Sequence, residues 1–329
     1  MLDVKVLNDT IRIGKHFRVS FQRTLRIPDD GGTYPLPPGL GEFPVLRVDD
    51  YADRVPKEWR KQGGVFIPMY QREALWLSFD APYWRPCAVK VAAGKVNAIT
   101  GKGWRRPLAK TRQDYLVCPD QPWLDGINAG DGFIRQFVAM PLGMGYTVEG
   151  QVTGKEEFGG IQLLVFDPKP GLFREPEPEP VHALRFAPDA VMDVCCDSAP
   201  MGLAAGGRMR QKIYPDEYGY ETWDPENYGR VYVHIVNSLM FREITGREPP
   251  ATPVTARTYT EYGLPWFELY DEAKGDLEGS EILGKVKSVK DMDKKKGFGA
   301  QQDDTPVEVG DGQVVTLGAE GEPVRDGKW

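Results

Sequence analysis

Residues 118–166, CPDQPWLDGINAGDGFIRQFVAMPLGMGYTVEGQVTGKEEFGGIQLLVF, combine apolar runs, glycines and carboxylates more densely than the rest of the chain. Residues 133–141 and 160–166 are short apolar runs bounded by Gly, Pro or Asp, a pattern typical of buried or half-buried strands. Residues 146–154, which lie between them, alternate apolar and polar side chains in part. The segment therefore predicts three strands joined by glycine-rich turns.

A second segment further along the chain has a weak sequence similarity to this one. Met140-x-Leu142-x-x-Gly145 recurs as Met201-x-Leu203-x-x-Gly206, and, after a slip of one residue, Gln151 with Glu157-Phe158-Gly159 recurs as Gln211 with Glu217-Tyr218-Gly219. An internal repeat would change the interpretation of the whole fold. The two alternatives are a pair of related β modules and a chance similarity among common residues.

Length and composition set the class of the protein. A chain of 329 residues exceeds a typical domain of about 100–200 residues, so we expect two domains or one elaborated β domain. Apolar residues make up 41% and charged residues 27%, as in ordinary globular proteins, and the 28 Pro and 37 Gly favour turns over long helices. We expect a β-dominated α+β fold with mainly antiparallel sheets and few short helices.

The clearest boundary is the segment 167–180, DPKPGLFREPEPEP, because alternating Glu and Pro is stiff and cannot join the centre of a sheet. We expect a β-rich domain over residues 1–170, a Glu/Pro linker over 171–180, a smaller β module with a following helix over 181–270, and a polar, partly flexible tail over 271–329. Within the tail, residues 285–299 predict a solvated segment, and residues 307–317 predict a closing hairpin.

Three shorter segments have clear local signals. Residues 17–27 alternate, so Phe17, Val19 and Phe21 should face one side of a half-solvated strand. Residues 55–63 and 252–263 each have proline near the start and glycine at the end, which predicts two short helices.

Charge is distributed unevenly along the chain, whose net charge is −7. Residues 1–110 contain 19 Lys and Arg against 11 Asp and Glu, whereas residues 171–329 contain 18 against 29. The two ends therefore either attract each other or serve different partners.

No apolar run approaches the roughly 20 residues of a transmembrane helix, and the first residues lack the apolar core of a signal peptide. The spacing of Cys87, Cys118, Cys195 and Cys196 suits neither a disulfide framework nor a CxxC pair. Three scattered histidines disfavour zinc, and the glycine-rich segments match no nucleotide-binding motif. We expect a cytoplasmic protein without membrane contact, cofactor or metal.

The strongest concentration of positive charge is residues 102–112, KGWRRPLAKTR, with five cations, one tryptophan and no acid. Arg105 and Arg106 beside Trp104 suit contact with a polyanion. A pI near 5.3 opposes a dedicated nucleic-acid binder. The alternative is a solvated or acid-paired loop.

Two sets of residues suit hydrolytic chemistry. Asp125 beside Trp123 suits sugar stacking, or acid–base work if a second carboxylate such as Glu149 comes within reach; the carboxylates between Asp120 and Glu157 are the candidates. Cys195 with His234 is the one thiol and imidazole pair to test for nucleophilic catalysis. The alternatives are turn aspartates that bond to nearby backbone, and a buried cysteine with a core histidine.

Aromatic residues gather in predicted loops and suggest a binding surface. Trp123, Tyr218, Trp223, Tyr262 and Trp266 are the candidates, and the alternative for them is packing on the protein's own core. We expect a non-catalytic binding or assembly protein whose partner is another protein or a second copy, rather than nucleic acid. A hydrolase and a polyanion binder are the rival hypotheses. An open sheet edge would favour assembly, a basic patch polyanion binding, and convergent titratable groups a hydrolase.

Overall fold

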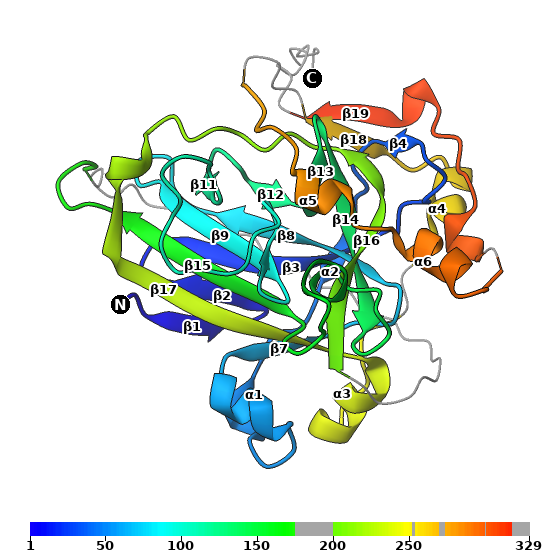
Figure 1. The fold of residues 1–329 in the computed structure, drawn as a ribbon, viewed down its shortest axis with the longest axis horizontal. Coiled ribbons are helices and arrows are strands. Elements are labelled where there is room, and N and C mark those ends of the chain that lie inside the picture. Colours follow the sequence, from blue (N-terminus) through cyan, green and yellow to red (C-terminus); the bar gives the residue numbers. More distant parts are fainter. Residues whose placement is uncertain (175–199, 252–253, 270–273, 300, 318–329) are drawn as a thin grey trace, which may run out of the picture.

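The computed structural model describes residues 1–174, 200–251, 254–269, 274–299 and 301–317. These residues form one sheet of 17 strands, a separate two-stranded sheet and six short α-helices (Figure 1). Within the described residues, most strand pairs are antiparallel and the parallel ones are β4 with β16, β7 with β17 and β18 with β19. The expected β-dominated α+β fold with mainly antiparallel sheets is confirmed.

The strands are β1 Val4–Leu7, β2 Thr10–Ile13, β3 Phe17–Thr24, β4 Thr33–Tyr34, β5 Gly39–Glu42, β6 Leu46–Arg47, β7 Val65–Pro68, β8 Ala74–Asp80, β9 Cys87–Ala93, β10 Val96–Asn97, β11 Leu116–Cys118, β12 Trp123–Leu124, β13 Gly126–Gly130, β14 Phe133–Pro141, β15 Ile161–Pro168, β16 Pro200–Arg210, β17 Trp223–Val236, β18 Trp266–Leu269 and β19 Val314–Leu317. The α-helices are α1 Lys57–Gln62, α2 Val148–Thr153, α3 Ser238–Thr245, α4 Ala256–Glu261, α5 Glu281–Gly284 and α6 Val289–Lys295.

The large sheet has two arms that meet at β16 and β17. One arm runs β1, β2, β3, β8, β14 and β16, and the other runs β17, β15, β9 and β11, with antiparallel pairing at each step. Met201 of β16 pairs with Ile235 of β17 and joins the arms. A single core cluster includes Phe21 of β3 and Leu163 of β15, so the two arms pack face to face around the main core.

Alternation along β3 predicts its buried face correctly. Phe17, Val19 and Phe21 are at most 2% exposed and belong to the main core, while Arg18 between them is exposed. The alternating period of a strand therefore decides which side chains of this segment enter the core.

Strands from both sides of residues 171–180 share the large sheet. β16 pairs with β14 over most of its length, and β17 pairs with β15 from Ile161 to Pro168. Of the expected linker, residues 175–180 lie outside the described part of the chain. The division into two domains stays a prediction, and the pairing adds that β16 and β17 lie together between β14 and β15 in one sheet.

The structure does not support two related β modules. After Met140 and Leu142 the chain forms α2, whereas Met201 and Leu203 lie inside β16, which continues to Arg210. The two segments lie side by side as antiparallel neighbours, with Met140 opposite Gly202. Their similarity is therefore not accompanied by a shared local structure.

The expected strand over residues 146–154 is wrong, because most of this segment is α2. Thr147 caps the helix by accepting a hydrogen bond from Gly150 N at 3.0 Å, and Gly154 ends it in the left-handed conformation with φ of 78°. Glu149 is buried in this helix and accepts bonds from the backbone amides of residues 157–159. Capping and this buried carboxylate outweigh the partial alternation of apolar residues.

The C-terminal segment, by which we mean the described residues 274–299 and 301–317, packs on the sheet. Val286, Val289 and Met292 are at most 7% exposed, so the expected solvated segment at residues 285–299 is wrong for residues 286–293, whereas residues 294–299 are exposed. The expected hairpin at residues 307–317 is also wrong, since β19 pairs in parallel with β18. In Figure 1, β18, β19, α4 and α6 cover one side of the molecule. Tertiary contacts of a few apolar residues therefore override the polar composition of this segment.

The two helices expected from proline and glycine signals are present. α1 lies within residues 55–63, and α4 lies within 252–263, although residues 252–253 are outside the described part. Thr255 caps α4 by accepting a bond from Thr258 N at 3.2 Å. Among the described residues, none of the helices has the length and apolar character needed to cross a membrane.

Candidate functional site

A groove of about 840 Å³ crosses β15 and β17, and we call it the basic groove. Its lining contains six cations and one carboxylate, namely Lys5, Arg47, Lys61, Lys95, Arg106, Arg230 and Asp49. A concave surface with one sign of charge concentrates the electric field and attracts ligands of the opposite sign. The groove therefore favours an anionic ligand.

The floor of the groove is the outer face of the second arm. In the register of β15 and β17, Gln162 lies opposite Tyr232 and Leu164 lies opposite Arg230. Side chains two residues apart on a strand share a face, so these four lie together. The floor combines a polar amide, an aliphatic surface, an aromatic ring and a guanidinium.

One wall is the basic segment 102–112, which a buried lysine holds in place. Lys90 is 1% exposed, and its Nζ donates to Arg105 O at 2.9 Å, Pro107 O at 2.7 Å and Asp114 Oδ2 at 2.8 Å. A buried ammonium needs such partners because desolvation is costly. The segment is therefore a fixed cover over the sheet, and it presents Trp104 and Arg106 to the groove.

Three cations of the groove have no carboxylate within 4 Å among the described residues: Lys95, Arg106 and Arg230. Lys95 Nζ lies 3.6 Å from the centre of the Phe158 ring, and the Arg106 guanidinium lies 5.1 Å from the centre of the Tyr228 ring. Aromatic faces attract cations without neutralising them. These three side chains keep their full charge for a ligand.

The other three cations of the groove have acidic partners nearby. Lys5 pairs with Asp3, Lys61 with Glu58, and Arg47 with Asp49 and Asp50. All these pairs are well exposed, so each contributes little to stability.

The opposite wall is β1, all four residues of which line the groove. Among the described strands, β1 pairs with β2 alone, so its other edge is open. Leu7 and Thr10 flank the two-residue turn at Asn8 and Asp9, which places their hydrogen bonds between the strands. By alternation, the backbone groups of Val4 and Val6 point to the open edge. Val4 is 37% exposed and Leu7 is 43% exposed.

β17 also offers backbone groups to the groove. Tyr228 O accepts a bond from Leu2 N at 2.8 Å, and Tyr232 O faces Gly64, where an added Cβ would lie 2.1 Å from it. Because backbone groups two residues apart point the same way, the N–H and C=O of Arg230 face this side as well. The groove therefore combines positive charge with unpaired strand edges.

No family model, no curated protein sequence and no solved structure matches this chain.

His234 lies beside the groove, on the same face of β17 as Tyr232, and does not line it. It is 2% exposed and stacks between Trp59 and Tyr232, with ring centres 4.2 Å and 4.3 Å away. Its Nε2 donates to Gly63 O at 3.0 Å. Burial lowers the pKa of His234 to about 4, and the bond to Gly63 opposes this shift. The neutral His234 ring stacks on the Tyr232 ring and fixes its position. Cys195, its expected partner, lies outside the described residues, so this pair stays a prediction.

The two carboxylates considered for hydrolysis have separate surroundings. Asp125 is buried and bonds to Gln211, whereas Glu149 is buried in α2 and bonds to the amides of residues 157–159. Because three backbone amides donate to the Glu149 carboxylate, this side chain stabilises the turn at residues 157–159. Asp125 and Trp123 line a small pocket with Trp76. The structure therefore brings the predicted pair Trp123 and Asp125 together, while each carboxylate makes its own contacts.

The expected aromatic contact residues divide by burial. Trp223 and Trp266 are at most 2% exposed, and their indole N–H groups donate to Asp216 and Thr260. These two pack the protein's own core. Tyr218 is 39% exposed and Tyr262 is 78% exposed, so both can reach a partner.

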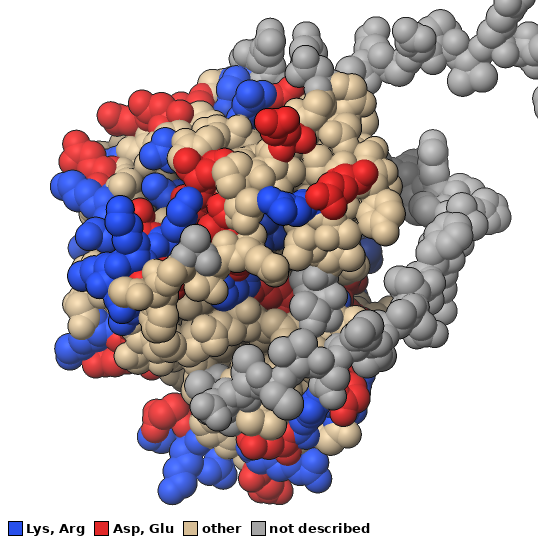
Figure 2. All heavy atoms as spheres, turned by 90° about the vertical axis from the view of Figure 1, so that its right-hand side faces the viewer, with Lys and Arg blue, Asp and Glu red and all other residues tan. Residues whose placement is uncertain are grey.

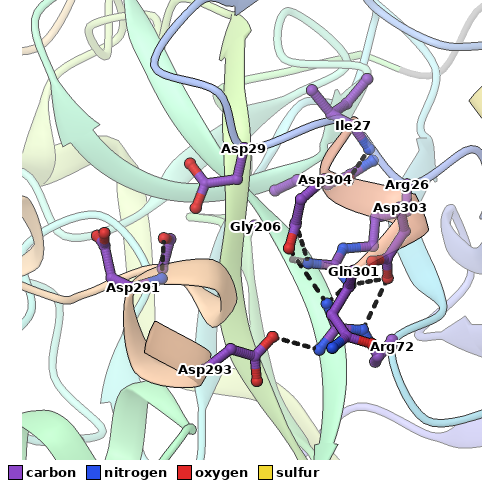
Figure 3. Close-up of polar contacts among 12 residues, drawn as sticks. Arg26, Ile27, Asp29, Arg72, Gly206, Asp291, Asp293, Gln301, Asp303 and Asp304 are labelled. Carbon is purple, nitrogen blue, oxygen red and sulfur yellow. Dashed lines mark hydrogen bonds and ion pairs between the residues drawn. The ribbon is translucent and has the colours of Figure 1, made fainter. Parts of the chain in front are cut away.

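A second set of charges joins the C-terminal segment to the sheet, and we call it the arginine–aspartate cluster: Arg26, Arg72, Asp293, Asp303 and Asp304 (Figure 3). Arg72 donates to Asp293 and to Asp303, each at 2.7 Å, and Tyr146 donates to Asp293 at 2.7 Å. Among the described residues, no group of three or more metal-ligating side chains is arranged to hold a metal ion. The cluster is a structural contact in which carboxylates face guanidinium groups.

The face of the molecule around the C-terminal segment carries both signs of charge. Figure 2 shows Lys and Arg interspersed with Asp and Glu around an uncharged central area. The pattern differs from that of the basic groove, in which one carboxylate accompanies six cations.

Proposed function

We propose that this protein is a non-catalytic binding protein that takes an acidic, extended segment of a partner protein into the basic groove. The observation that carries the proposal is the convergence, among the described residues, of an open strand edge, β1, with three cations that lack carboxylate partners there, Lys95, Arg106 and Arg230. An added strand would gain main-chain hydrogen bonds at the edge, and its acidic side chains would meet the cations.

A peptide suits this groove better than a nucleic acid does. Nucleic acids have no donors and acceptors at strand spacing to pair with the edges of β1 and β17, whereas a peptide strand has both. The exposed apolar side chains of Val4 and Leu7 lie on opposite faces of β1, and each adds a contact for peptide side chains on its own face.

The proposal includes a cytoplasmic location. Cys87 and Cys118 lie opposite each other in β9 and β11, and both are buried free thiols. A reducing compartment keeps such thiols apart.

The experiment that tests the proposal is a fluorescence anisotropy titration with a labelled peptide in which Glu alternates with Val. We expect saturable binding that weakens as salt is added, because the contacts are between exposed charges. The same peptide with Gln in place of Glu should bind about tenfold more weakly, which corresponds to about 1.4 kcal/mol. An oligothymidylate that binds as tightly as the acidic peptide would contradict the choice of a protein partner.

Two pairs of variants separate charge from strand pairing. Arg230→Glu should weaken binding of the acidic peptide about tenfold, whereas Lys285→Glu, an exposed cation outside the groove, should leave it unchanged. Val6→Pro removes a backbone donor at the open edge, and Val6→Ala keeps it. The proposal fails if Val6→Pro and Val6→Ala bind the peptide equally, or if Lys285→Glu has the effect of Arg230→Glu.

A further inference from the structure

A second pocket, of about 190 Å³, is lined almost entirely by apolar and aromatic side chains. Trp76 of β8 and Trp123 of β12 meet edge to face, with ring centres 6.3 Å apart and an angle of 67° between the planes. Phe267 of β18 and the proline-containing residues 36–39 complete the walls. We call it the tryptophan pocket.

The tryptophan pocket contains one ionisable side chain, Asp125. This residue is 3% exposed, and its Oδ2 accepts a hydrogen bond from Gln211 Nε2 at 2.7 Å. Among the described residues, no hydrogen bond reaches its Oδ1 and no cation pairs with it. Buried carboxylates are ordinarily paired, because leaving such a charge without a partner is costly.

Asp125 is therefore held in an environment that disfavours its ionised form. Desolvation raises the pKa of Asp125 to about 7, and the bond from Gln211 opposes that rise. The Asp125 Oδ1, which no hydrogen bond reaches among the described residues, belongs to the one carboxylate in the lining of this aromatic pocket. An unneutralised carboxylate in such a lining indicates that a cationic ligand completes the site.

We propose that the tryptophan pocket binds the alkylated ammonium group of an organic cation. Two indole rings and a phenyl ring line the pocket, and aromatic π systems of this kind attract such a cation. The Asp125 carboxylate supplies the opposite charge. The apolar walls suit the alkyl groups, which a bare metal ion or a strongly hydrated ammonium lacks. The volume of about 190 Å³ limits the ligand to a small head group.

The surroundings leave Asp125 as the group that responds to pH in this pocket. Gln211 is the polar side chain that contacts it, and the other lining side chains are Trp76, Trp123, Phe267 and the apolar residues at 36–38. Charged side chains on the neighbouring elements have other partners: Arg210 pairs with Glu268, and Glu42 accepts from Gln22. A bound cation would favour the ionised carboxylate, so binding releases a proton when the solution is below pH 7.

This inference is independent of the proposed function, because Asp125, Trp76 and Trp123 do not line the basic groove. The probe is choline, with 3,3-dimethylbutan-1-ol as its uncharged isostere, and the measurement is isothermal titration calorimetry on the full chain. We expect choline to bind at least tenfold more tightly than the alcohol. Its affinity should fall about tenfold for each pH unit below 7, as the carboxyl takes up a proton.

The variant Asp125→Asn keeps an acceptor for Gln211 but removes the charge, so it should lose most of the preference for choline and all of the pH dependence. Asp120→Asn, an aspartate that pairs with Lys274 outside the pocket, is the matched control and should behave as the wild type. The same titration with a trimethyllysine amide in place of choline tests whether the ammonium group comes from a protein side chain or from a free metabolite.

Equal binding of choline and the alcohol by the wild type would overturn the proposal, as would the absence of saturable binding of choline. Since these two comparisons and the pH profile use the wild-type protein, they hold even if Asp125→Asn does not fold.

Discussion

Arg26 and Arg72 in the arginine–aspartate cluster each contact two or more carboxylates, whereas Arg106 and Arg230 in the basic groove have none within 4 Å among the described residues. The Arg26 side chain is 6% exposed, while Arg106 and Arg230 are exposed. The same guanidinium group is thus enclosed and neutralised on one side of the molecule, and open and uncompensated on the other.

The difference separates charges that hold the fold from charges that are available to a ligand. Removing one partner of a buried pair leaves the other charge desolvated, which is strongly destabilising. Removing an exposed cation leaves nothing buried, so the fold barely responds. The two regions should therefore respond oppositely to stability and binding measurements.

The largest effect is expected for Arg72→Met, which leaves the carboxylates of Asp293, Asp303 and Asp304 short of a partner. We expect the free energy of unfolding to fall by about 4 kcal/mol, in the range for one partner lost from a buried pair. Urea denaturation measures it. Arg18→Met is the control, because Arg18 lies 3.6 Å from Asp80 with both side chains more than half exposed. If Arg72→Met lowers the free energy of unfolding no more than Arg18→Met does, the arginine–aspartate cluster does not stabilise the fold as we expect.

A smaller effect is expected at acid pH, from the His234 imidazole beside the groove. The folded-state pKa of His234 is about 4, below the ordinary value of 6.5. At pH values between these two, His234 is protonated in the unfolded chain and neutral in the folded chain. The free energy of unfolding therefore falls as the pH is lowered from about 6.5 to about 4. The shift corresponds to about 3 kcal/mol over this window.

The variant His234→Gln should lack that contribution, and the half-buried His16→Gln should keep it. The measurement is the difference in the free energy of unfolding between pH 7 and pH 4.5 for wild type and each variant. Identical pH dependence in wild type and His234→Gln would show that the Trp59–His234–Tyr232 stack admits the charged ring.

The smallest effect on stability is expected in the groove itself. Arg230→Glu should change the free energy of unfolding by no more than about 0.5 kcal/mol, as exposed substitutions usually do. The same variant should lose binding of the acidic peptide. Destabilisation comparable to that of Arg72→Met would assign this cation to the fold and remove the distinction between the two regions.

Local patterns in the sequence predict the sheet well. Alternation at Phe17, Val19 and Phe21 identifies the core face of β3, and the apolar runs at 133–141 and 160–166 become β14 and β15. Prediction fails where distant contacts decide the outcome. The helix α2 depends on a buried carboxylate that binds amides of a later turn, and the C-terminal segment packs through Val286, Val289 and Met292 within a polar stretch.

The site is less accessible to sequence reasoning than the fold. The basic segment 102–112 and the pair Trp123 and Asp125 stand out by composition, and each of them lines a concave region. Lys95 is a single cation in the turn between β9 and β10, and Arg230 is a single cation within β17. Only the register of β15 and β17 brings Arg230 into the groove. An open edge also has no sequence signature, because it is the absence of a neighbour to β1.

The uneven charge along the chain leaves two alternatives open, and the two regions correspond to them. Arg26 and Arg72 of the basic half bind aspartates of the acidic half, so the ends attract each other there. Lys95 and Arg106 of the same basic half have no such partner among the described residues, and we assign them to a separate ligand.

The most direct test is amide hydrogen exchange of the protein with and without the acidic peptide. If a peptide strand pairs with the open edge, the amides of Val4, Val6 and Arg230 become protected when the peptide is added, and the amides around Asp293 and Asp303 exchange as before. Binding of the peptide without new protection at β1 and β17, or with protection centred on the C-terminal segment, would contradict the account.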